Sequence, residues 1–387
     1  MRLSLQASGK ARQLDVPRLR KNFADIAAHG DEVALFFYSD LFIRHPELRD
    51  LFPVSMAAQR GHLLDALGRI VACVDRTGEL GGFLEGLGRD HRKFGVAGEH
   101  YPMVGESLVA TLEFFSGDRW SAELAADWRA AFSVVARVMA GAAAADEGRG
   151  LPAFWRGVVG ACERRGPDVA VLQVRPEPAL EFVAGQSVAV CSPRRPRLWR
   201  YYSIANAPRP DGSVEFHVRL VDGGQVSGVL TDGQVAGEEL WLGPPAGALR
   251  LDGSDREVVM VAGSTGLAPL KALCEQLAAD QGPGGRRRVR LFFSARTGDE
   301  LYDLPALEKM AAEHPWLTIT PTVTADPRYA GERGPLAEVV ARGGDWAGAE
   351  AYLAGPSLMV EAVAARLTAA GTPRERIHIE DFGWSEP

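Results

Sequence analysis

Four consecutive residues near the middle of the chain, Arg200 to Ser203, carry groups that together suit a flavin. A guanidinium pairs with a diphosphate, an aromatic face stacks on a flat ring system, and a hydroxyl can donate or accept a hydrogen bond. In a regular strand Arg200 and Tyr202 face one side, and Tyr201 and Ser203 face the other. An ordinary strand with one exposed arginine would carry the same residues, so a flavin site needs support from elsewhere in the chain.

Two later segments combine glycine with hydroxyl residues and could receive phosphate groups. In the first, Gly224 and Ser227 stand at the start of an expected helix, where free backbone N–H groups attract anions. In the second, residues 258–269 have the order buried strand, glycine turn and helix, so a phosphate group could again lie at a helix N-terminus. Its spacing differs from the Gly-x-Gly-x-x-Gly fingerprint. The turn and the helix after it supply the candidates Gly263, Ser264, Thr265, Gly266 and Pro269.

The character of the sequence changes twice along the chain, which predicts three domains. Residues 15–147 show helical spacing of apolar residues without strand signals, so we expect an all-α unit. Residues 152–253 contain short strands separated by Gly and Pro turns, which predicts a small antiparallel β-barrel. Residues 255–387 alternate strands with helices, which predicts a parallel α/β domain with a nucleotide crevice at its strand ends.

The composition excludes several classes of protein. The chain has 387 residues, enough for two or three domains, and its 46% hydrophobic and 24% charged residues are typical of a soluble globular protein. A net charge of −7 argues against a nucleic-acid partner, and the cluster Arg286, Arg287 and Arg288 is expected to be a solvated loop. No apolar run is long enough to span a membrane, and the N-terminus lacks a signal-peptide pattern. Four cysteines without paired spacing predict reduced thiols in a cytoplasmic protein.

The helical part contains four residues that could form a heme pocket. Tyr38 lies on a strongly apolar helix, Phe52 follows a Pro-Glu-Leu segment, and His91 and Tyr101 lie on later helices. A single neutral imidazole can bind heme iron on one side and leave the other side open. Each residue also has an ordinary explanation, since a lone histidine is usually not a ligand and a tyrosine among phenylalanines is usually a core residue.

The order of these motifs resembles a known family. Arg-x-Tyr-Ser, Gly-x-x-Ser and a Gly-rich nucleotide turn follow one another in the ferredoxin-reductase family of flavoproteins, and the resemblance covers about residues 152–387. The helical part looks like the globin domain of flavohemoglobins, which is joined to such a reductase. The whole chain therefore resembles a flavohemoglobin.

The resemblance implies a role for each candidate of the globin part. His91 is expected to bind the iron of heme b, and Phe52 to pack on the porphyrin. Tyr38 would point its hydroxyl at dioxygen on the iron and stabilise its partial negative charge. Tyr101 would form a hydrogen bond behind His91 and make the imidazole a stronger donor.

Three positions of the globin part depart from the family pattern. Ala145 stands where the family has an acidic residue that completes a relay with the histidine and the tyrosine, and the adjacent Asp146 could take that place. On the distal helix the family usually presents a glutamine, whereas this chain offers His62 or Leu63. Asp90 stands where the family often has lysine.

The reductase part receives its roles in the same way. Arg200 is expected to bind the FAD diphosphate, Tyr202 to stack on the flavin next to Tyr201, and Ser203 to lie beside N5. Gly224 and Ser227 would lie on the phosphate side. Near the C-terminus, Phe382 would lie near the flavin and Glu380 near the gap between heme and flavin.

For the nicotinamide dinucleotide, the resemblance implies the turn of residues 263–266 with Pro269, and Gly355 near the nicotinamide. Ala354 replaces a cysteine of the family there. NADH is the implied coenzyme. Arg296 follows a predicted strand and could meet the 2′-phosphate of NADPH, so the choice between the two stays open.

The function that the resemblance implies is a nitric oxide dioxygenase. Electrons would pass from NAD(P)H through FAD to heme, where dioxygen would oxidise nitric oxide to nitrate. Two alternatives stay open: an oxygen-binding or sensing globin with its own reductase, and an NAD(P)H-dependent flavin reductase without nitric oxide activity. We expect a monomer whose partners are small molecules, with no nucleic acid and no membrane.

Overall fold

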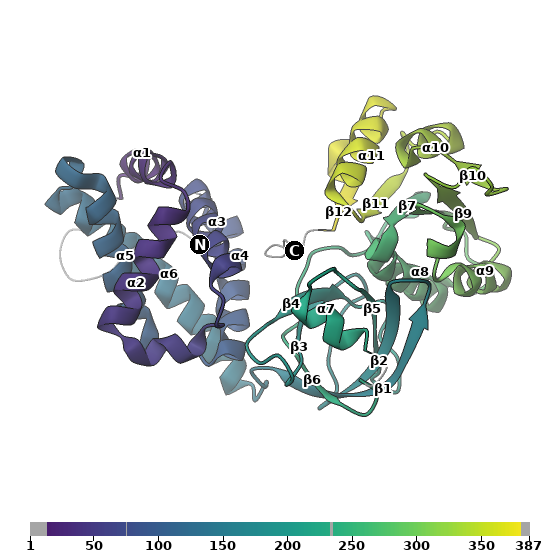
Figure 1. Ribbon diagram of the computed structural model, residues 1–387. Coiled ribbons are helices and arrows are strands. Elements are labelled where there is room, and N and C mark those ends of the chain that lie inside the picture. Colours follow the sequence, from purple (N-terminus) through teal and green to yellow (C-terminus); the bar gives the residue numbers. More distant parts are fainter. Residues whose placement is uncertain (1–13, 75, 233–234, 381–387) are drawn as a thin grey trace. The chain divides into compact units, whose positions relative to one another are not determined.

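The computed structural model describes residues 14–74, 76–232 and 235–380 (Figure 1). Of these residues, those up to Phe154 form one compact unit, and those from Trp155 onward form a second. The expectation for Phe382 lies outside the described residues.

The first unit consists of helices, as the spacing of its apolar residues predicts. The side chain of Ser121 caps the last helix by accepting a hydrogen bond from Leu124 N at 3.2 Å. Gly117, with a φ of 54°, ends the helix before it, because this backbone conformation suits glycine. The elements are α1 Val16–Ala27, α2 Asp31–Arg44, η1 Pro46–Leu51, α3 Ala57–Cys73, α4 Thr77–His91, η2 Arg92–Phe94, α5 His100–Ser116, η3 Gly117–Arg119 and α6 Ala122–Gly148.

The buried apolar side chains of this unit form two clusters. The larger surrounds Tyr38 and includes Leu41 and Leu112. The smaller is formed by Leu80, Leu84 and Met139 and lies between α4 and α6. These two helices approach so closely that a Cβ atom at Gly88 would overlap the backbone of Met139. Close packing therefore fixes the end of α4, where His91 lies.

The second unit begins with an antiparallel sheet of six strands in the order β4-β3-β6-β1-β2-β5. The edge strands β4 and β5 meet at one antiparallel bridge between Ile204 and Phe216, so the sheet curls toward a barrel. Burial alternates at the start of β1, as expected for a strand with one buried face. The elements are β1 Trp155–Arg165, β2 Val169–Glu177, β3 Ser187–Cys191, β4 Arg200–Ser203, β5 Val214–Arg219, α7 Gln225–Leu230 and β6 Glu239–Leu242.

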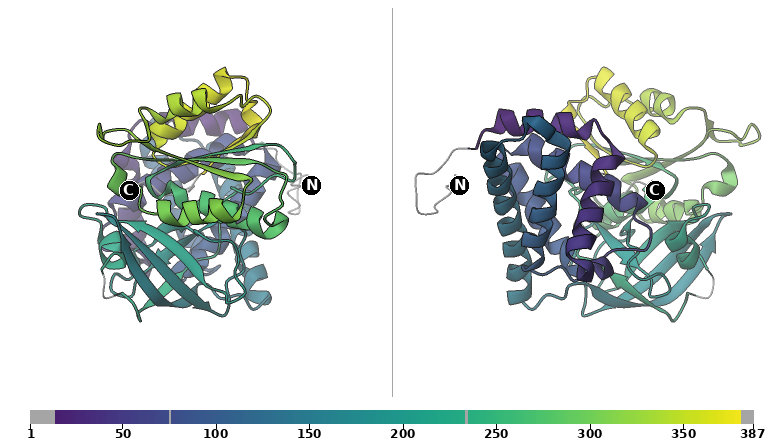
Figure 2. Two further views of the ribbon diagram at one scale, coloured as in Figure 1. Left: turned by 90° about the vertical axis from the view of Figure 1, so that its right-hand side faces the viewer. Right: turned by 60° about the vertical axis from the view of Figure 1, so that its left-hand side comes forward.

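A parallel sheet of six strands follows, in the order β10-β9-β8-β7-β11-β12. Helices α8 and α9 cover one face and α10 and α11 the other (Figure 2). The strand order reverses at β7, and sheets of this kind bind nucleotides outside the ends of the strands at such a reversal, here β7 and β11. The elements are β7 Val258–Gly263, η4 Ser264–Gly266, α8 Leu267–Gln281, β8 Val289–Ala295, η5 Gly298–Glu300, α9 Leu304–Glu313, β9 Leu317–Val323, β10 Glu332–Arg333, α10 Leu336–Gly343, β11 Glu350–Ala354, α11 Ser357–Ala369, η6 Arg374–Arg376 and β12 Ile377–Ile379.

The two sheets of the second unit share a hydrophobic core. Val169 and Val171 of the antiparallel sheet belong to the same buried cluster as Leu267, Leu270 and Leu273 of α8. The helix that begins at the nucleotide turn therefore packs on both sheets.

One expectation about the charged residues was wrong. Arg286 and Arg288 are exposed, but Arg287 is buried. Its guanidinium donates to the carbonyl oxygens of Arg256 at 2.9 Å and Asp252 at 3.0 Å and pairs with the Asp252 carboxylate. Arg287 therefore holds the segment before β7 in place, because a buried guanidinium needs such partners.

None of the helices in the described part of the chain has the length and hydropathy that a membrane crossing requires. All four cysteines are free thiols; Cys191 and Cys274 are buried, and Cys73 and Cys162 are partly exposed.

Candidate functional site

His91 is held in the form that binds a metal ion. Its Nδ1 lies 2.8 Å from the carbonyl oxygen of Leu87, so Nδ1 carries the proton and donates to that oxygen. Burial lowers the pKa of His91, although the carboxylate of Asp90 opposes this effect. Within the described residues Nε2 makes no hydrogen bond, and its lone pair is available to a ligand. A neutral imidazole oriented by such a bond is the usual axial ligand of heme iron.

Tyr38 lies among aromatic side chains in the larger apolar cluster of the helical unit. Its ring packs edge-on against Phe52 at a centroid distance of 5.6 Å and lies 5.9 Å from Phe42. The hydroxyl donates to the carbonyl oxygen of Gln59 at 3.3 Å, a long hydrogen bond. Burial raises the pKa of Tyr38, so the hydroxyl stays neutral and keeps its proton.

Gln59 is a residue that the sequence analysis missed. It lies in the first turn of α3, which begins at Ala57, whereas we expected the distal residue to be His62 or Leu63. The start of α3 has no side-chain cap to mark it in the sequence. His62 and Leu63 are both partly exposed, and Leu63 packs against the cluster around Tyr38.

Tyr101 and Asp146 do not form the relay that the family pattern suggests. Tyr101 is half-buried against the smaller core cluster, and in the described part of the chain no hydrogen bond joins it to His91. The buried Asp146 carboxylate instead accepts from Arg149 at 2.5 Å and lies 3.4 Å from Arg89. These arginines occupy the carboxylate, so it is not directed at Tyr101.

The flavin motif forms strand β4, paired to β3 with Tyr202 opposite Val188. Tyr202 packs against the core of the antiparallel sheet, and Arg200 donates to the carbonyl oxygen of Trp199 at 2.9 Å. Tyr201 is partly exposed. The four residues therefore form an edge strand of the sheet, which agrees with the strand predicted for them.

The Ser203 hydroxyl donates to Oε1 of Glu380, and this contact joins the flavin strand to the last described residue. The backbone N–H of Glu380 donates to Leu353 of β11 at 3.0 Å, which anchors the segment. Burial raises the pKa of Glu380 to about 7, although the bond from Ser203 opposes the rise. The pair is therefore placed to accept or release a proton near neutral pH.

Gly224 and Ser227 form the start of helix α7, as expected. The Ser227 hydroxyl accepts from Val221 N at 3.2 Å, which closes the turn before the helix. A Cβ atom at Gly224 would overlap that hydroxyl, so the turn requires glycine there.

The nucleotide turn joins β7 to α8 and consists of residues 263–266. A Cβ atom at Gly266 would overlap the backbone of Ala354, and one at Gly355 would lie 2.9 Å from Gly263 N. The ends of the neighbouring strands β7 and β11 therefore pack backbone to backbone, which only glycine allows at these positions. Ser264 adopts a φ of 53°, Thr265 is partly exposed, and Pro269 is buried in α8.

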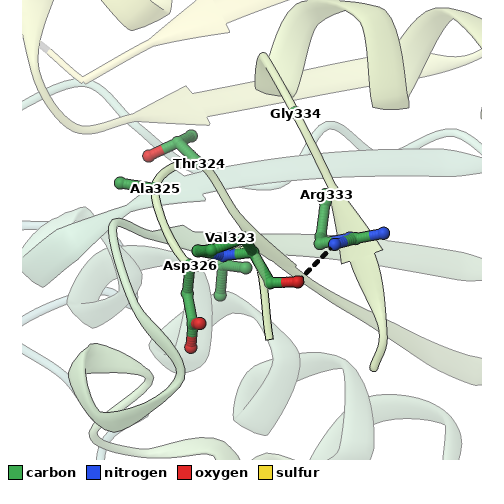
Figure 3. Close-up of a pocket in the computed structure, with 7 residues that line it drawn as sticks. Val323, Thr324, Ala325, Asp326, Arg333 and Gly334 are labelled. Atoms are coloured by element: carbon green, nitrogen blue, oxygen red, sulfur yellow. Dashed lines mark hydrogen bonds between the residues drawn. The ribbon is translucent and has the colours of Figure 1, made fainter. Parts of the chain in front are cut away.

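Farther along the same sheet edge, an acidic residue meets Arg296. The guanidinium of Arg296 donates to the Glu300 carboxylate at 2.9 Å, and this carboxylate also accepts from the backbone N–H of Arg296 at 3.2 Å. A hollow of about 500 Å³ lies between the segment that follows β9 and strand β10. Figure 3 shows Thr324, Asp326 and Arg333 around it.

Three families match consecutive parts of the chain. The globin family matches residues 35–139, the oxidoreductase FAD-binding domain residues 163–250, and the oxidoreductase NAD-binding domain residues 260–365. The flavohemoprotein of Bordetella pertussis is 30% identical over 391 residues, which cover 92% of this chain and 94% of the relative. This chain belongs to the flavohemoprotein family.

Two solved structures share the fold. The flavohemoglobin of Malassezia yamatoensis, with bound FAD and heme, aligns with a TM-score of 0.78 at 18% identity and covers 95% of this chain and 98% of that one. The FAD/NAD-binding domain of a nitric oxide dioxygenase from Vibrio cholerae aligns with a TM-score of 0.52 at 22% identity and covers 59% of this chain and 98% of that one. This flavohemoprotein thus has a globin domain for heme and FAD- and NAD-binding domains, the parts of an oxidoreductase.

Proposed function

We propose that this flavohemoprotein is an NAD(P)H-dependent nitric oxide dioxygenase. Nitric oxide, dioxygen and one electron balance to one nitrate ion, and each NAD(P)H supplies two electrons. The observation that carries the proposal is the pair of His91, with an open Nε2, and Tyr38, with a weakly engaged hydroxyl, in a chain that contains its own reductase. The name of the Vibrio cholerae relative, a nitric oxide dioxygenase, supports the same activity.

The residues present fit the three groups that this reaction needs. His91 offers a nitrogen without a hydrogen bond in the described chain, which would hold heme iron, and Phe52 packs in the apolar cluster that includes Tyr38. Arg200, Tyr202 and Ser203 fit FAD, and the glycine contacts of residues 263–266 fit a dinucleotide. When bound, FAD would convert two-electron reduction by NAD(P)H into single-electron transfer to heme, where oxygen chemistry takes place.

Tyr38 would supply a neutral hydrogen-bond donor to a ligand of a bound heme. Its raised pKa keeps the hydroxyl protonated, and its only hydrogen bond in the described chain, to Gln59, is long enough to be exchanged. A donor fixed in advance stabilises negative charge that develops on an oxygen ligand.

Ser203 and Glu380 supply a route for a proton. Ser203 Oγ can accept a proton from a group beside it while its own proton passes to Glu380 Oε1. With a pKa of about 7, Glu380 can take up and release this proton in the neutral range.

Nitric oxide consumption tests the proposal. In air, NADH should accelerate nitric oxide consumption, with nitrate as the product. Tyr38→Phe should lower this rate roughly fivefold, since one net hydrogen bond contributes about 1 kcal/mol. The control is Ser133→Ala, which removes an exposed hydroxyl of the same globin domain and should keep the wild-type rate. A rate unchanged by NADH would contradict the proposal.

Glu300 is expected to favour NADH over NADPH. Its carboxylate can accept a ribose 2′-hydroxyl and occupies the arginine that a 2′-phosphate would need. Glu300→Ala should therefore raise kcat/KM for NADPH relative to NADH about tenfold, or about 1.4 kcal/mol. Steady-state kinetics with both coenzymes measures this, with the exposed Glu313→Ala as control. An unchanged ratio would show that the carboxylate does not select the coenzyme.

A second candidate function is an oxygen-binding globin with its own reductase. The arginine partners of Asp146 favour it, because without a relay to Tyr101 the proximal imidazole donates less electron density. Tight oxygen binding combined with slow nitric oxide turnover would select this candidate.

A further inference from the structure

A cluster of buried charges lies where the antiparallel sheet meets helix α8. Lys271 Nζ lies 2.5 Å from Glu215 Oε1 and 3.3 Å from Asp303 Oδ2. The side chains of Lys271, Glu215 and Asp303 are 7%, 6% and 1% exposed. Arg165 of β1 pairs with the other oxygen of Asp303. We call these four residues the interdomain charge cluster, since β1 and β5 belong to one sheet and α8 and α9 to the other domain.

The four residues of the interdomain charge cluster are two carboxylates and two cations, and Arg209 Nη2 also lies 3.2 Å from Glu215 Oε2. His217 Nε2 lies 3.0 Å from Glu215 Oε1, and its Nδ1 lies 2.8 Å from the Tyr302 hydroxyl. Burial lowers the pKa of His217, so its imidazole is neutral. It forms hydrogen bonds with both Glu215 and Tyr302. Burial alone would raise the pKa of Glu215, but the bond from His217 and the charge of Lys271 hold it below its ordinary value. Glu215 is therefore a carboxylate at neutral pH, paired with the Lys271 ammonium.

Strand β5 contacts both segments that we assign to cofactors. At one end Ala205 N, two residues after Ser203, donates to the backbone oxygen of Glu215 at 2.8 Å. At the other end Arg219 donates to the Ser264 hydroxyl of the nucleotide turn at 3.1 Å. The side chain of the same Glu215 pairs with Lys271, one helical turn beyond the start of α8.

We propose that the Glu215–Lys271 pair is a positioning clamp that fixes the flavin strand relative to the nucleotide turn and so sets the geometry of hydride transfer. The backbone of Glu215 holds the flavin strand, and its side chain holds the helix that begins at the nucleotide turn. The clamp rests on the proposed binding of FAD and the nicotinamide dinucleotide by these two segments.

Positioning explains the pair better than stability does. The cost of desolvating two charges largely offsets their attraction, so a buried ion pair adds little net stability. Leu270 and Leu273 already bury the same helix in the shared core. Apolar contacts allow small sliding movements, whereas a short ion pair has one geometry, and a displacement of about 1 Å can lower the rate of a reaction by up to about 10²-fold.

The test compares the wild type with the double variant Glu215→Gln/Lys271→Met, which removes the pair without leaving one buried charge unpaired. Arg366→Gln is the control, because it breaks an exposed ion pair with Glu338 in the same domain. FAD content and cooperative thermal unfolding establish that each variant is folded. Stopped-flow measurement gives the rate of flavin reduction and the dissociation constant for NADH. The absorbance of the charge-transfer complex between the reduced protein and NAD⁺ reports the stacking of the two rings without turnover.

We expect flavin reduction in the double variant to slow about tenfold while the dissociation constant for NADH changes less than about threefold. The charge-transfer absorbance should weaken, and Arg366→Gln should match the wild type. If the double variant loses FAD, Lys271→Arg, which keeps the charge but changes the length of the pair, should slow reduction about threefold.

The clamp is overturned if the folded double variant, or Lys271→Arg in its place, keeps wild-type reduction and charge-transfer absorbance. A fall in thermal stability alone would assign the pair a structural role. If NADH does not reduce the flavin of the wild type, the proposed function fails and the clamp with it, which is a different result from an active wild type with an unaffected variant.

Discussion

Replacing His91 by alanine is expected to leave the chain without heme. His91 is the last residue of α4. Its Nδ1 donates a hydrogen bond to the Leu87 carbonyl oxygen, and its Nε2 makes no hydrogen bond in the described chain. Loss of an outer hydrogen-bond partner of a metal ligand already lowers affinity by about 10- to 100-fold, so loss of the ligand should lower heme affinity further. FAD binding should persist, because the flavin motif lies in the other compact unit.

Iron analysis and the absorbance spectrum measure this prediction directly. His100→Ala is the matched control, since His100 lies on the next helix and accepts a hydrogen bond from Ala97 N at 3.1 Å. The control should keep heme. If His91→Ala also kept its iron and the heme spectrum, another residue would hold the heme, and the assignment of His91 would be wrong.

Glu380→Gln is expected to slow the passage of electrons from the flavin by about 10²-fold, the effect of losing a typical general base. Glutamine can keep the hydrogen bond with Ser203 but cannot take up its proton. Hydride transfer from NADH needs no proton from this route, so flavin reduction should change much less than reoxidation.

The pH dependence gives this prediction its sign. The carboxylate accepts a proton only when ionised, and its pKa is about 7. Reoxidation in the wild type should therefore rise between about pH 6 and pH 8 and then level off. Stopped-flow reoxidation across this range is the measurement, and the exposed Glu375→Gln in the same C-terminal segment is the control. A variant that kept the wild-type rate and pH profile would remove Glu380 from the proton route.

Much of the fold could be predicted from the sequence because local patterns determine it. Helical spacing in residues 15–147 and the order strand, glycine turn and helix in residues 258–269 both correspond to elements of the structure. Short elements were missed, since β10 has two residues and β12 has three, too few for a periodic pattern. Helix α10, which follows β10 in the chain, was also missed.

The candidate site was less predictable where it depends on distant residues. The sequence suggests charged groups at the surface, but Lys271 and Glu215, 56 residues apart, are buried against each other. Glu300 was overlooked as the acidic residue near Arg296, because the η5 turn brings it back toward the strand end. The partners of Asp146 likewise follow from the packing of α4 on α6 and not from its position in the sequence.

The central claim is that electrons from NADH reach heme through the flavin of the same chain. It is tested most directly by mixing the oxidised protein anaerobically with NADH under carbon monoxide and recording its absorbance over time. The account predicts that the flavin bleaches first and that the heme band then shifts to the position of the ferrous carbon monoxide complex. A bleached flavin beside an unchanged heme spectrum would contradict it.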